Sequence, residues 1–305
     1  MRTITENNLT WVDIEKPTPE DIGWLKNLKE FFHPLTLSEL IPPSKREKVE
    51  QFRDYLFLIM YVPIFNPKKR TTTPAELDVL ITKDYVITIH NEPIEPLSIF
   101  AEELKKRETK ERVFGATTGH LFYWLVEDIL GFAERQLAHI SKNISRVEDN
   151  MFKSISRDMI KEISTIKRDV LDFRMAVRPL YRIFNSLYEK SHTLWTNDMD
   201  IKVYFNDLIG DYNRLWHEID NYADTIDALE KTNINLLNDK TNTIVKMFTI
   251  MSFLTFPAML VATILQINTK TNPILGNPND FWIILGIVSI TILAMLTYFK
   301  TRKWL

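Results

Sequence analysis

Two stretches without a charged side chain, residues 247–265 and 281–299, lie close together in the C-terminal part of this 305-residue chain. Each stretch has 19 residues, most of them large and apolar. A bilayer core about 30 Å thick needs roughly 20 helical residues to cross it, and a helix pairs its own backbone polar groups there. The two stretches therefore predict two transmembrane helices. Their length and placement favour this interpretation over a pair of buried helices in a soluble core.

The basic residues around the two spans predict the orientation of the chain. Lys240 and Lys246 precede the first span, whereas the connecting loop, residues 266–280, holds a single basic residue, Lys270. The basic residues after the second span are Lys300, Arg302 and Lys303. Basic residues gather on the cytoplasmic side of membrane proteins. We therefore expect both termini in the cytoplasm and the short loop outside; in an oligomer, the basic residues after the second span would form a ring.

Residues 1–115 have the pattern of a cytoplasmic domain with mixed α and β structure. Residues 52–65 are rich in β-branched and aromatic residues, as strands are. Two apolar stretches, 77–82 and 85–90, are separated by two polar residues, which predicts a hairpin. Residues 17–32 begin with prolines and acids, which predicts a helix.

Residues 116–243 differ in character and predict a stalk of long helices. Apolar residues recur there at steps of three and four, which is typical of amphipathic helices, and Pro179 is the only proline between residues 118 and 243. Residues 197–265 are predicted to form one helix about 100 Å long, at 1.5 Å per residue. The third domain, residues 244–305, then holds the two spans, the outer loop and the basic tail.

Several kinds of chemistry lack the residues they need. The chain has no cysteine and no glycine-rich phosphate loop. His217 and Glu218 begin like a zinc-protease motif, but Asn221 stands where the second histidine is required. The net charge of −2 gives no reason to expect a nucleic acid partner. We therefore expect neither an enzyme nor a nucleic-acid-binding protein.

A polar seam follows the first span at alternating steps of three and four residues. Its members are Asn242, Val245, Thr249, Ser252, Phe256, Met259, Thr263 and Gln266. This is the period of helices packed around a common axis, and polar residues in a membrane usually face a partner helix or water. The seam therefore lines a pore or packs against another helix through Ser and Thr. Two spans cannot enclose a pore, so the pore interpretation requires an oligomer.

Several motifs, in this order and at this spacing, resemble those of the CorA family of magnesium and cobalt channels. They are Trp11-Val12-Asp13, His33-Pro34-Leu35, Tyr55-Leu56-Phe57, Tyr85-Val86-Ile87-Thr88, Arg178-Pro179-Leu180, Lys240-Thr241-Asn242, Pro257, Asn268 and Lys303-Trp304-Leu305. The resemblance implies a funnel-shaped homopentamer of the inner membrane, with an α+β cytoplasmic domain, long helices and first spans that line the pore. It implies a passive divalent-cation channel closed by cytoplasmic cation.

The resemblance also implies an entry site for the cation. The family ends its first span with Gly-Met-Asn, whose Asn ring receives hydrated Mg²⁺, and here the triplet is Gln266-Ile267-Asn268. Amide oxygens suit Mg²⁺ because this ion sheds its water reluctantly. The implied transported and regulatory ion is Mg²⁺, with Co²⁺, Ni²⁺ or Zn²⁺ as alternatives. The altered triplet leaves two other functions open: a proton-coupled zinc transporter of the same fold, and a membrane-anchored regulatory protein that does not conduct.

The family closes when cytoplasmic Mg²⁺ bridges carboxylates of neighbouring protomers. By position, the resemblance assigns this regulatory pair to Glu39 and Asp207, with Glu127 as a third member. Ser38 stands where the family commonly has an acid. The alternative is that these are ordinary surface carboxylates.

Overall fold

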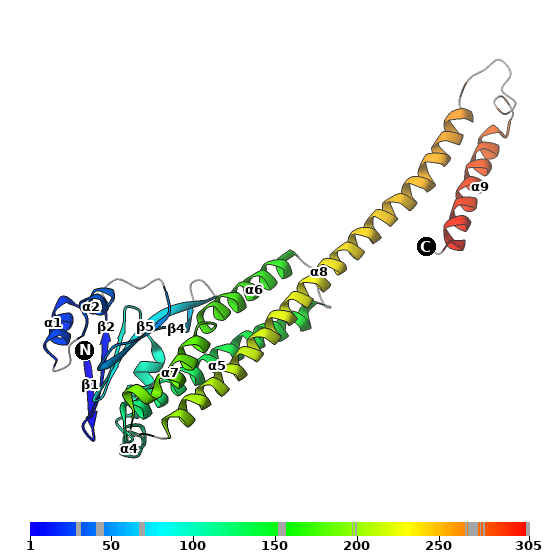
Figure 1. The fold of residues 1–305 in the computed structure, drawn as a ribbon. Helices are drawn as coiled ribbons and strands as arrows, with labels where there is room; N and C mark the ends of the chain where they lie inside the picture. Colours follow the sequence, from blue (N-terminus) through cyan, green and yellow to red (C-terminus); the bar gives the residue numbers. More distant parts are fainter. Residues whose placement is uncertain are drawn as a thin grey trace. The chain divides into compact units, whose positions relative to one another are not determined.

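A computed structural model describes most of the chain in two compact units, Met1–Glu230 and Lys231–Leu305 (Figure 1). The described residues are 1–28, 32–40, 46–66, 71–151, 157–196, 198, 200–265, 267, 274, 276 and 278–302. The first unit contains a sheet and long helices, and the second contains the apolar C-terminal helices. The division predicted at residues 115 and 243 stays a prediction from the residue pattern.

The first unit begins with a six-stranded sheet of order β1-β2-β6-β5-β4-β3. Its strands are β1 (Arg2–Glu6), β2 (Leu9–Glu15), β3 (Lys48–Gln51), β4 (Tyr55–Asn66), β5 (Thr71–Thr82) and β6 (Tyr85–His90). β2 and β6 pair in parallel, and the other neighbouring pairs are antiparallel. The predicted hairpin is confirmed, because β5 and β6 are antiparallel on either side of Lys83 and Asp84. β5 begins earlier than predicted. The first half of this strand contains polar residues, so the apolar stretch behind the prediction covers only its second half.

The long helices predicted after the α/β part are confirmed. They are α5 (Thr118–Met151), α6 (Arg157–Val177), α7 (Leu180–Leu194) and α8 (Ile201–Leu265). Two short helices, α3 (Glu95–Glu103) and α4 (Arg107–Val113), connect the sheet to α5. α6 and α7 are separate because Pro179 stands at the N-cap of α7, and proline cannot continue a helix. α8 has 65 residues and begins at Ile201, four residues later than predicted.

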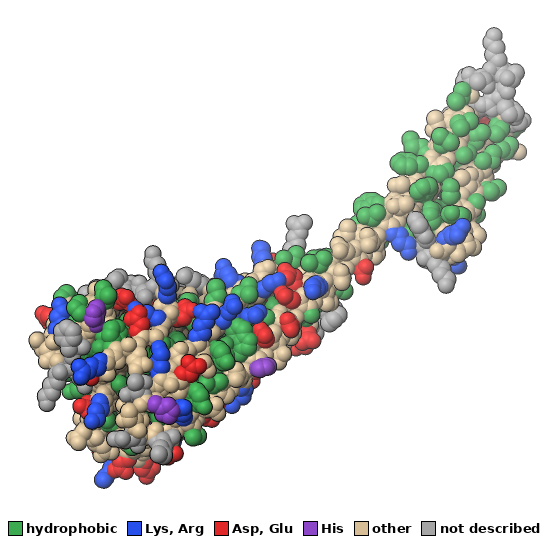
Figure 2. Space-filling model, viewed as in Figure 1, with side chains coloured by type: hydrophobic (Ala, Val, Ile, Leu, Met, Phe, Trp, Pro, Cys, Tyr) green, Lys and Arg blue, Asp and Glu red, His purple; other side chains and the backbone are tan. Residues whose placement is uncertain are grey.

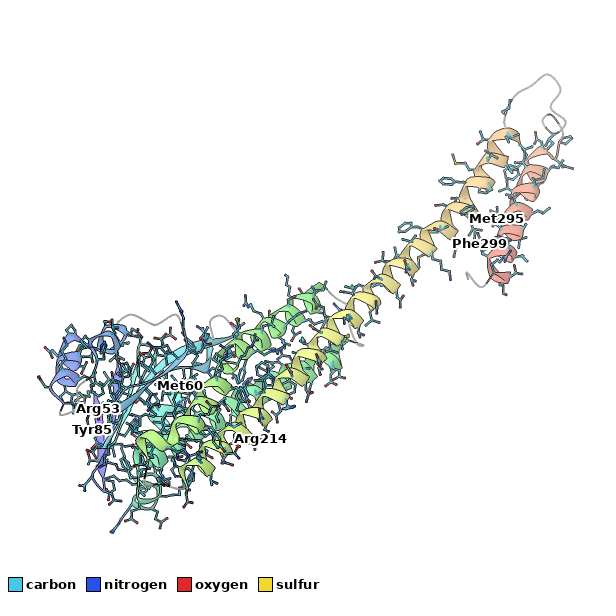
Figure 3. The ribbon with its side chains drawn as sticks, viewed as in Figure 1. Arg53, Met60, Tyr85, Arg214, Met295 and Phe299 are labelled. Carbon is cyan, nitrogen blue, oxygen red and sulfur yellow. The ribbon has the colours of Figure 1, made fainter. Side chains whose placement is uncertain are left out.

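Both faces of the sheet are buried. Phe57 and Ile59 pack in one apolar cluster with residues of α1 (Pro19–Asn27) and α2 (Pro34–Glu39). Side chains alternate along a strand, so the buried Leu58 and Met60 point to the other face, where α5, α6 and α7 contact β4 (Figure 3). The sheet therefore separates α1 and α2 from the long helices.

The helix predicted over residues 17–32 is shorter than predicted. α1 starts at Pro19 because Thr18 and Asp21 form a capping box, in which each side chain bonds the other's backbone N–H. It ends at Asn27, since Leu28 has an extended backbone with ψ of 149°. Phe32 lies outside any helix. Sequence composition showed where the helix begins but not the change of backbone conformation that ends it.

The second unit contains the two predicted spans, inside α8 and α9 (Asp280–Thr301). Both helices are long and apolar enough to cross a membrane. Figure 2 shows hydrophobic side chains over the surface of these helices, whereas charged side chains are spread over the first unit. Pro257 lies inside α8, a position that membrane helices tolerate. Within this unit Ile250 and Phe299 are buried, so α8 and α9 touch mainly near these residues.

Candidate functional site: an uncovered helix face and a carboxylate cluster

The face of α8 that carries the polar seam is largely uncovered within the second unit. Its described members are Asn242, Val245, Thr249, Ser252, Phe256, Met259 and Thr263. Phe256 and Met259 are each 68% exposed, while Thr249 and Ser252 are half-buried. α9 therefore leaves this face free to meet water or other helices.

The hydroxyls of the seam bond to their own helix. Thr249 Oγ1 donates to the carbonyl oxygen of Val245 at 2.8 Å, and Thr263 Oγ1 donates to that of Met259 at 2.8 Å. These bonds satisfy the hydroxyl protons where no water is available. A hydroxyl that donates keeps lone pairs that can accept. The seam can therefore present acceptors to the waters of a hydrated cation.

Three of the predicted site residues, Gln266, Asn268 and Lys303, lie outside the described residues. Of the predicted basic ring, Lys300 lies in the last turn of α9 and Arg302 is its C-cap. Both side chains are exposed. Two positively charged side chains therefore lie at the end of the second span that the distribution of basic residues places in the cytoplasm.

In the first unit, α5 and α8 bring together two of the three predicted regulatory carboxylates. The hydroxyl of Tyr123 on α5 donates to Asp207 Oδ2 on α8 at 2.7 Å. Glu127 follows Tyr123 by four residues and Asp211 follows Asp207 by four, so each pair lies on one helix face. Sequence reasoning missed Tyr123 and Asp211. The matching four-residue spacing on the two helices is the signal that could have found them.

The electrostatics of this carboxylate cluster, Asp207, Glu127 and Asp211, favour an added positive charge. Burial raises the pKa of Glu127, and Asp211 raises it further. Burial also raises the pKa of Asp211, although the guanidinium of Arg214 lies 3.1 Å from its carboxylate. The guanidinium of Arg214, which is labelled in Figure 3, also forms an ion pair with the carboxylate of Glu134 at 2.9 Å. Crowded carboxylates repel one another, and a divalent cation relieves that repulsion.

The third predicted regulatory residue, Glu39, lies elsewhere. It is on α2, where its carboxylate forms an ion pair of 2.5 Å with Lys48. The sheet separates α2 from the helices that carry Asp207, so the two carboxylates lie on opposite sides of the sheet. A cation that bridges Glu39 and Asp207 must therefore do so between protomers.

A buried acidic residue close to Glu39, Asp78, was not among the residues predicted from the sequence. Asp78 on β5 is 4% exposed, and its Oδ1 has no hydrogen-bond partner among the described residues. Burial raises the pKa of Asp78 to about 8, with Glu76 and Glu39 raising it further. Its carboxyl group is therefore mostly protonated at neutral pH. The feature of the sequence that could have identified Asp78 is an acidic residue within an otherwise apolar stretch of strand.

No group of three or more His, Asp or Glu side chains in the part of the chain that the structure describes could hold a metal ion. The regulatory site stays a prediction, with the cluster at Asp207 on one side of the sheet and Glu39 on the other.

The fold defines a class of membrane protein: an N-terminal α/β unit and long helices, followed by two membrane-length C-terminal helices. Within this class, the family model described as CorA-like Mg²⁺ transporter protein matches residues 6–302. The chain belongs to this family of transporters, as its motifs predicted.

Named relatives match over nearly the whole chain. The cobalt/magnesium transport protein CorA of Thermotoga maritima is 22% identical over 298 residues, which cover 97% of this chain and 83% of that protein. The protein of the same name from Methanocaldococcus jannaschii is 21% identical over 300 residues, covering 97% of this chain and 92% of that protein.

The solved complete structure of the CorA magnesium transporter from Methanocaldococcus jannaschii has a TM-score of 0.86 with this chain at 20% identity. The match covers 100% of this chain and 95% of that one. It confirms the predicted fold class: a mixed α/β soluble part, long helices and two C-terminal apolar helices.

Proposed function

We propose that this chain forms a homopentameric channel for divalent cations in the inner membrane, with the seam of α8 around its pore. The observation that carries the proposal is the seam face, which α9 leaves uncovered and on which Phe256 and Met259 are each 68% exposed. The seam contains both the apolar Phe256 and Met259 and the hydroxyls of Thr249, Ser252 and Thr263, as in a pore that dewets at narrow points and accepts hydrated ions elsewhere. In a closed symmetric ring, the seam faces of the five α8 helices meet around the central axis.

Membership in the transporter family and the names of the relatives support Mg²⁺ and Co²⁺ as the transported ions. In this arrangement the first unit and both termini lie in the cytoplasm, where Lys300 and Arg302 meet the inner leaflet. Gln266 and Asn268 then stand at the outer mouth, where amide oxygens receive the hydrated ion.

The regulatory part of the proposal concerns Glu39, Asp207 and Glu127. A cytoplasmic divalent cation between Asp207 of one protomer and Glu39 of the next relieves the repulsion of the carboxylate cluster and holds the closed state. To reach Glu39 the cation competes with Lys48, which already forms an ion pair with it. This competition predicts a weak site that responds to millimolar cation.

Ion flux into proteoliposomes tests the function. The purified full-length protein is reconstituted, and uptake of Mg²⁺, Co²⁺, Ni²⁺ and Zn²⁺ is compared with and without a proton gradient. We expect Mg²⁺ and Co²⁺ uptake that needs no proton gradient. Zn²⁺ uptake that depends on the gradient supports the proton-coupled transporter instead, and no uptake of any ion supports the non-conducting protein.

The oligomeric state is tested separately. Native mass measurement in mild detergent should give five protomers of 36.0 kDa each. A monomer or dimer as the only species contradicts a pore built from first spans.

A further inference from the structure

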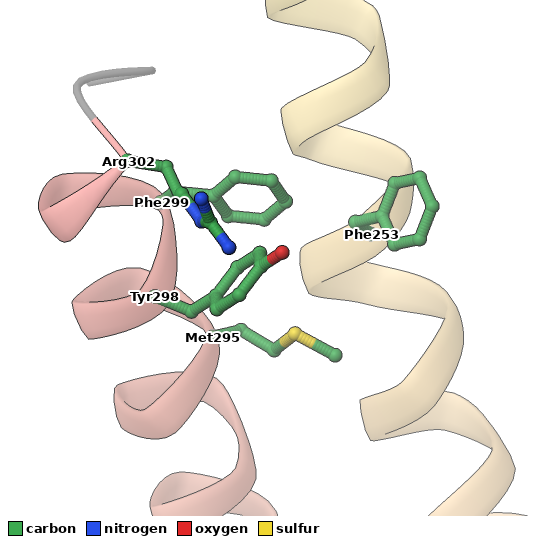
Figure 4. A pocket seen from close by; sticks show the side chains of 5 residues that line it. All are labelled: Phe253, Met295, Tyr298, Phe299 and Arg302. Carbon is green, nitrogen blue, oxygen red and sulfur yellow. The ribbon is translucent and has the colours of Figure 1, made fainter.

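A cavity lies between α8 and α9 in the second unit, and it uses none of the predicted pore residues. Its volume is about 590 Å³, and it is lined by Phe253 of α8 and by Met295, Tyr298, Phe299 and Arg302 of α9 (Figure 4). This volume lies within the range of about 300–1,000 Å³ that ligand pockets occupy. Phe253 and Phe299 meet edge to face, with ring centroids 6.1 Å apart. This contact joins the two helices beside the cavity.

The lining combines apolar side chains with two polar groups. Met295 and the two phenylalanines supply the apolar part, whereas the Tyr298 hydroxyl and the Arg302 guanidinium supply the polar part. In Figure 4 the Arg302 side chain lies over Tyr298 and Phe299, and its guanidinium carbon is 5.9 Å from the centre of the Tyr298 ring. The cavity therefore suits an amphipathic molecule with a long apolar part.

The charge of Arg302 points to the polar part of that molecule. Between Lys240 and Arg302 the sequence contains one acid, Asp280, and it begins α9 whereas Arg302 ends it. The other described acid of the second unit, Asp239, lies 14 residues before Phe253 on α8, about 21 Å along the helix at 1.5 Å per residue. Among the described residues, Arg302 therefore has no acidic neighbour along either helix. Guanidinium groups bind phosphate with paired hydrogen bonds, and a phosphate is the anion that a membrane surface supplies.

We propose that this cavity binds one anionic phospholipid of the cytoplasmic leaflet. Its phosphate lies at Arg302 and the Tyr298 hydroxyl, and one acyl chain lies along Met295, Phe253 and Phe299. The proposal rests on the proposed function in one respect, that α8 and α9 cross the membrane. Arg302 lies three residues after the end of the uncharged stretch at Phe299, so its long side chain can place the guanidinium at the depth of the phosphate groups.

A lipid fits the lining better than a helix from another copy of the chain. Helices that pack closely in membranes use small residues such as Gly, Ala, Ser and Thr at the contact. None of the described lining residues is of this kind, because Phe253, Met295, Tyr298, Phe299 and Arg302 are all large. A flexible acyl chain can fill such an irregular space.

The test measures bound lipid by native mass spectrometry. The full-length protein is reconstituted in vesicles of phosphatidylcholine and phosphatidylglycerol in equal amounts, extracted in mild detergent, and compared with two variants. Arg302→Gln removes the proposed phosphate ligand. Lys300→Gln removes the same charge two residues earlier, from a side chain that does not line the cavity.

We expect wild type to retain phosphatidylglycerol over phosphatidylcholine, and Arg302→Gln to lose about tenfold of this preference, as expected for one charge-assisted contact. Lys300→Gln should keep it. Equal losses in both variants would mean that general surface charge attracts the lipid, and no retained lipid or no preference in wild type would mean that the cavity is not a lipid site. Each of these results overturns the proposal.

A second measurement tests the competing occupant. The chain has no cysteine, so the pair Phe253→Cys and Met295→Cys can be oxidised without background. A crosslink within one chain agrees with the proposal, whereas efficient crosslinks between chains place a neighbouring first span in the cavity and overturn it. Flux reports on the function independently: lipid binding without flux refutes only the channel, and flux without lipid binding refutes only this site.

Discussion

The phenol of Tyr123 holds the carboxylate of Asp207 by a 2.7 Å hydrogen bond across two helices, from a position 84 residues earlier in the chain. Burial raises the pKa of Tyr123, and the bond to Asp207 raises it further. The phenol therefore keeps its proton and acts as a donor. It occupies one of the acceptor positions that a cation would otherwise use on Asp207.

The hydrogen bond between Tyr123 and Asp207 predicts that Tyr123→Phe lowers the stability of the protein but strengthens cation binding. Loss of a hydrogen bond to a charged group should lower the free energy of unfolding by about 1–3 kcal/mol. The released carboxylate should bind cation better, so protease protection of the first unit should appear at lower Mg²⁺ than in wild type. Tyr204→Phe is the control, since Tyr204 touches the Tyr123 ring. An unchanged Mg²⁺ midpoint in Tyr123→Phe would contradict a cation site at Asp207.

Asp78 predicts a dependence of stability on pH. Its pKa is about 8 in the folded protein and about 3.9 when unfolded, so the unfolded state loses this proton first. The stabilising contribution is therefore present below about pH 4 and is lost as the pH rises toward 8. We expect Asp78→Asn to have a higher thermal midpoint than wild type at about pH 8.5 and a flatter pH profile. Asp84→Asn, at an exposed turn, should follow wild type. Parallel profiles for Asp78→Asn and wild type would show that this carboxyl ionises freely.

The lack of space around Gly119 on α5 predicts that any larger residue there would clash with its neighbours. A β-carbon there would lie 2.5 Å from Cδ1 of Ile201 and 3.1 Å from Cε2 of Trp195. We expect Gly119→Ala to lower the free energy of unfolding by about 1–3 kcal/mol, although alanine favours helices. Gly131→Ala on the same helix meets only Arg135 at 3.7 Å, and it should stabilise by about 0.5–1 kcal/mol. Urea unfolding of both variants measures the contrast. If the clash is the cause, the double variant Gly119→Ala, Ile201→Ala should lose less stability than the sum of the two single losses, because Ile201 is buried and its truncation has a cost of its own.

Phe256 predicts the position of a hydrophobic constriction. Five phenylalanines around one axis would dewet the pore, so Phe256→Ala should raise leak conductance in proteoliposomes. Leu254→Ala, on nearly the opposite face of α8 at 100° per residue, removes a similar side chain and should leave the leak unchanged. Equal conductance in wild type and an assembled Phe256→Ala channel would place the gate elsewhere along α8.

Asn268 predicts the entry site. If five Asn amides bond the waters of the arriving ion, Asn268→Ala should abolish uptake while pentamers still form, and Asn268→Asp should change the ion preference sharply. If Asn268 only caps the C-terminal end of the first span, both variants should still transport the same ions, because loss of a cap affects stability and not ion binding. Flux assays with Mg²⁺ and Co²⁺, after native mass measurement of each variant, separate the two roles.

The sequence predicted features that follow from local pattern. The spans, the long helices and the hairpin at Lys83 and Asp84 each depend on periodicity or turn residues over short distances. The parallel pairing of β2 with β6 joins strands about 75 residues apart, as between Val12 and Ile87. No local pattern encodes such a pairing.

The same distinction holds for the carboxylate cluster. Glu127 and Asp207 were expected in one site because of family resemblance, but their shared environment depends on how α5 and α8 pack. Tyr123 and Asp211 complete that environment, and each looks like an ordinary surface residue in the sequence. The burial of Asp78 likewise depends on the cover that α2 and the sheet provide. Long-range packing therefore decided the parts that sequence reasoning missed.

The order of the two units along the chain has a consequence for biosynthesis. Ribosomes add about 5–20 residues per second, so synthesis of the 230 residues of the first unit takes roughly ten seconds or more, and all of it precedes the first apolar span. Many domains fold well within that time. The insertion machinery then receives a folded domain followed by a late apolar signal. A variant that slows folding of the sheet exposes its apolar strands while the spans are still in water, so its first defect should be aggregation of the newly made chain.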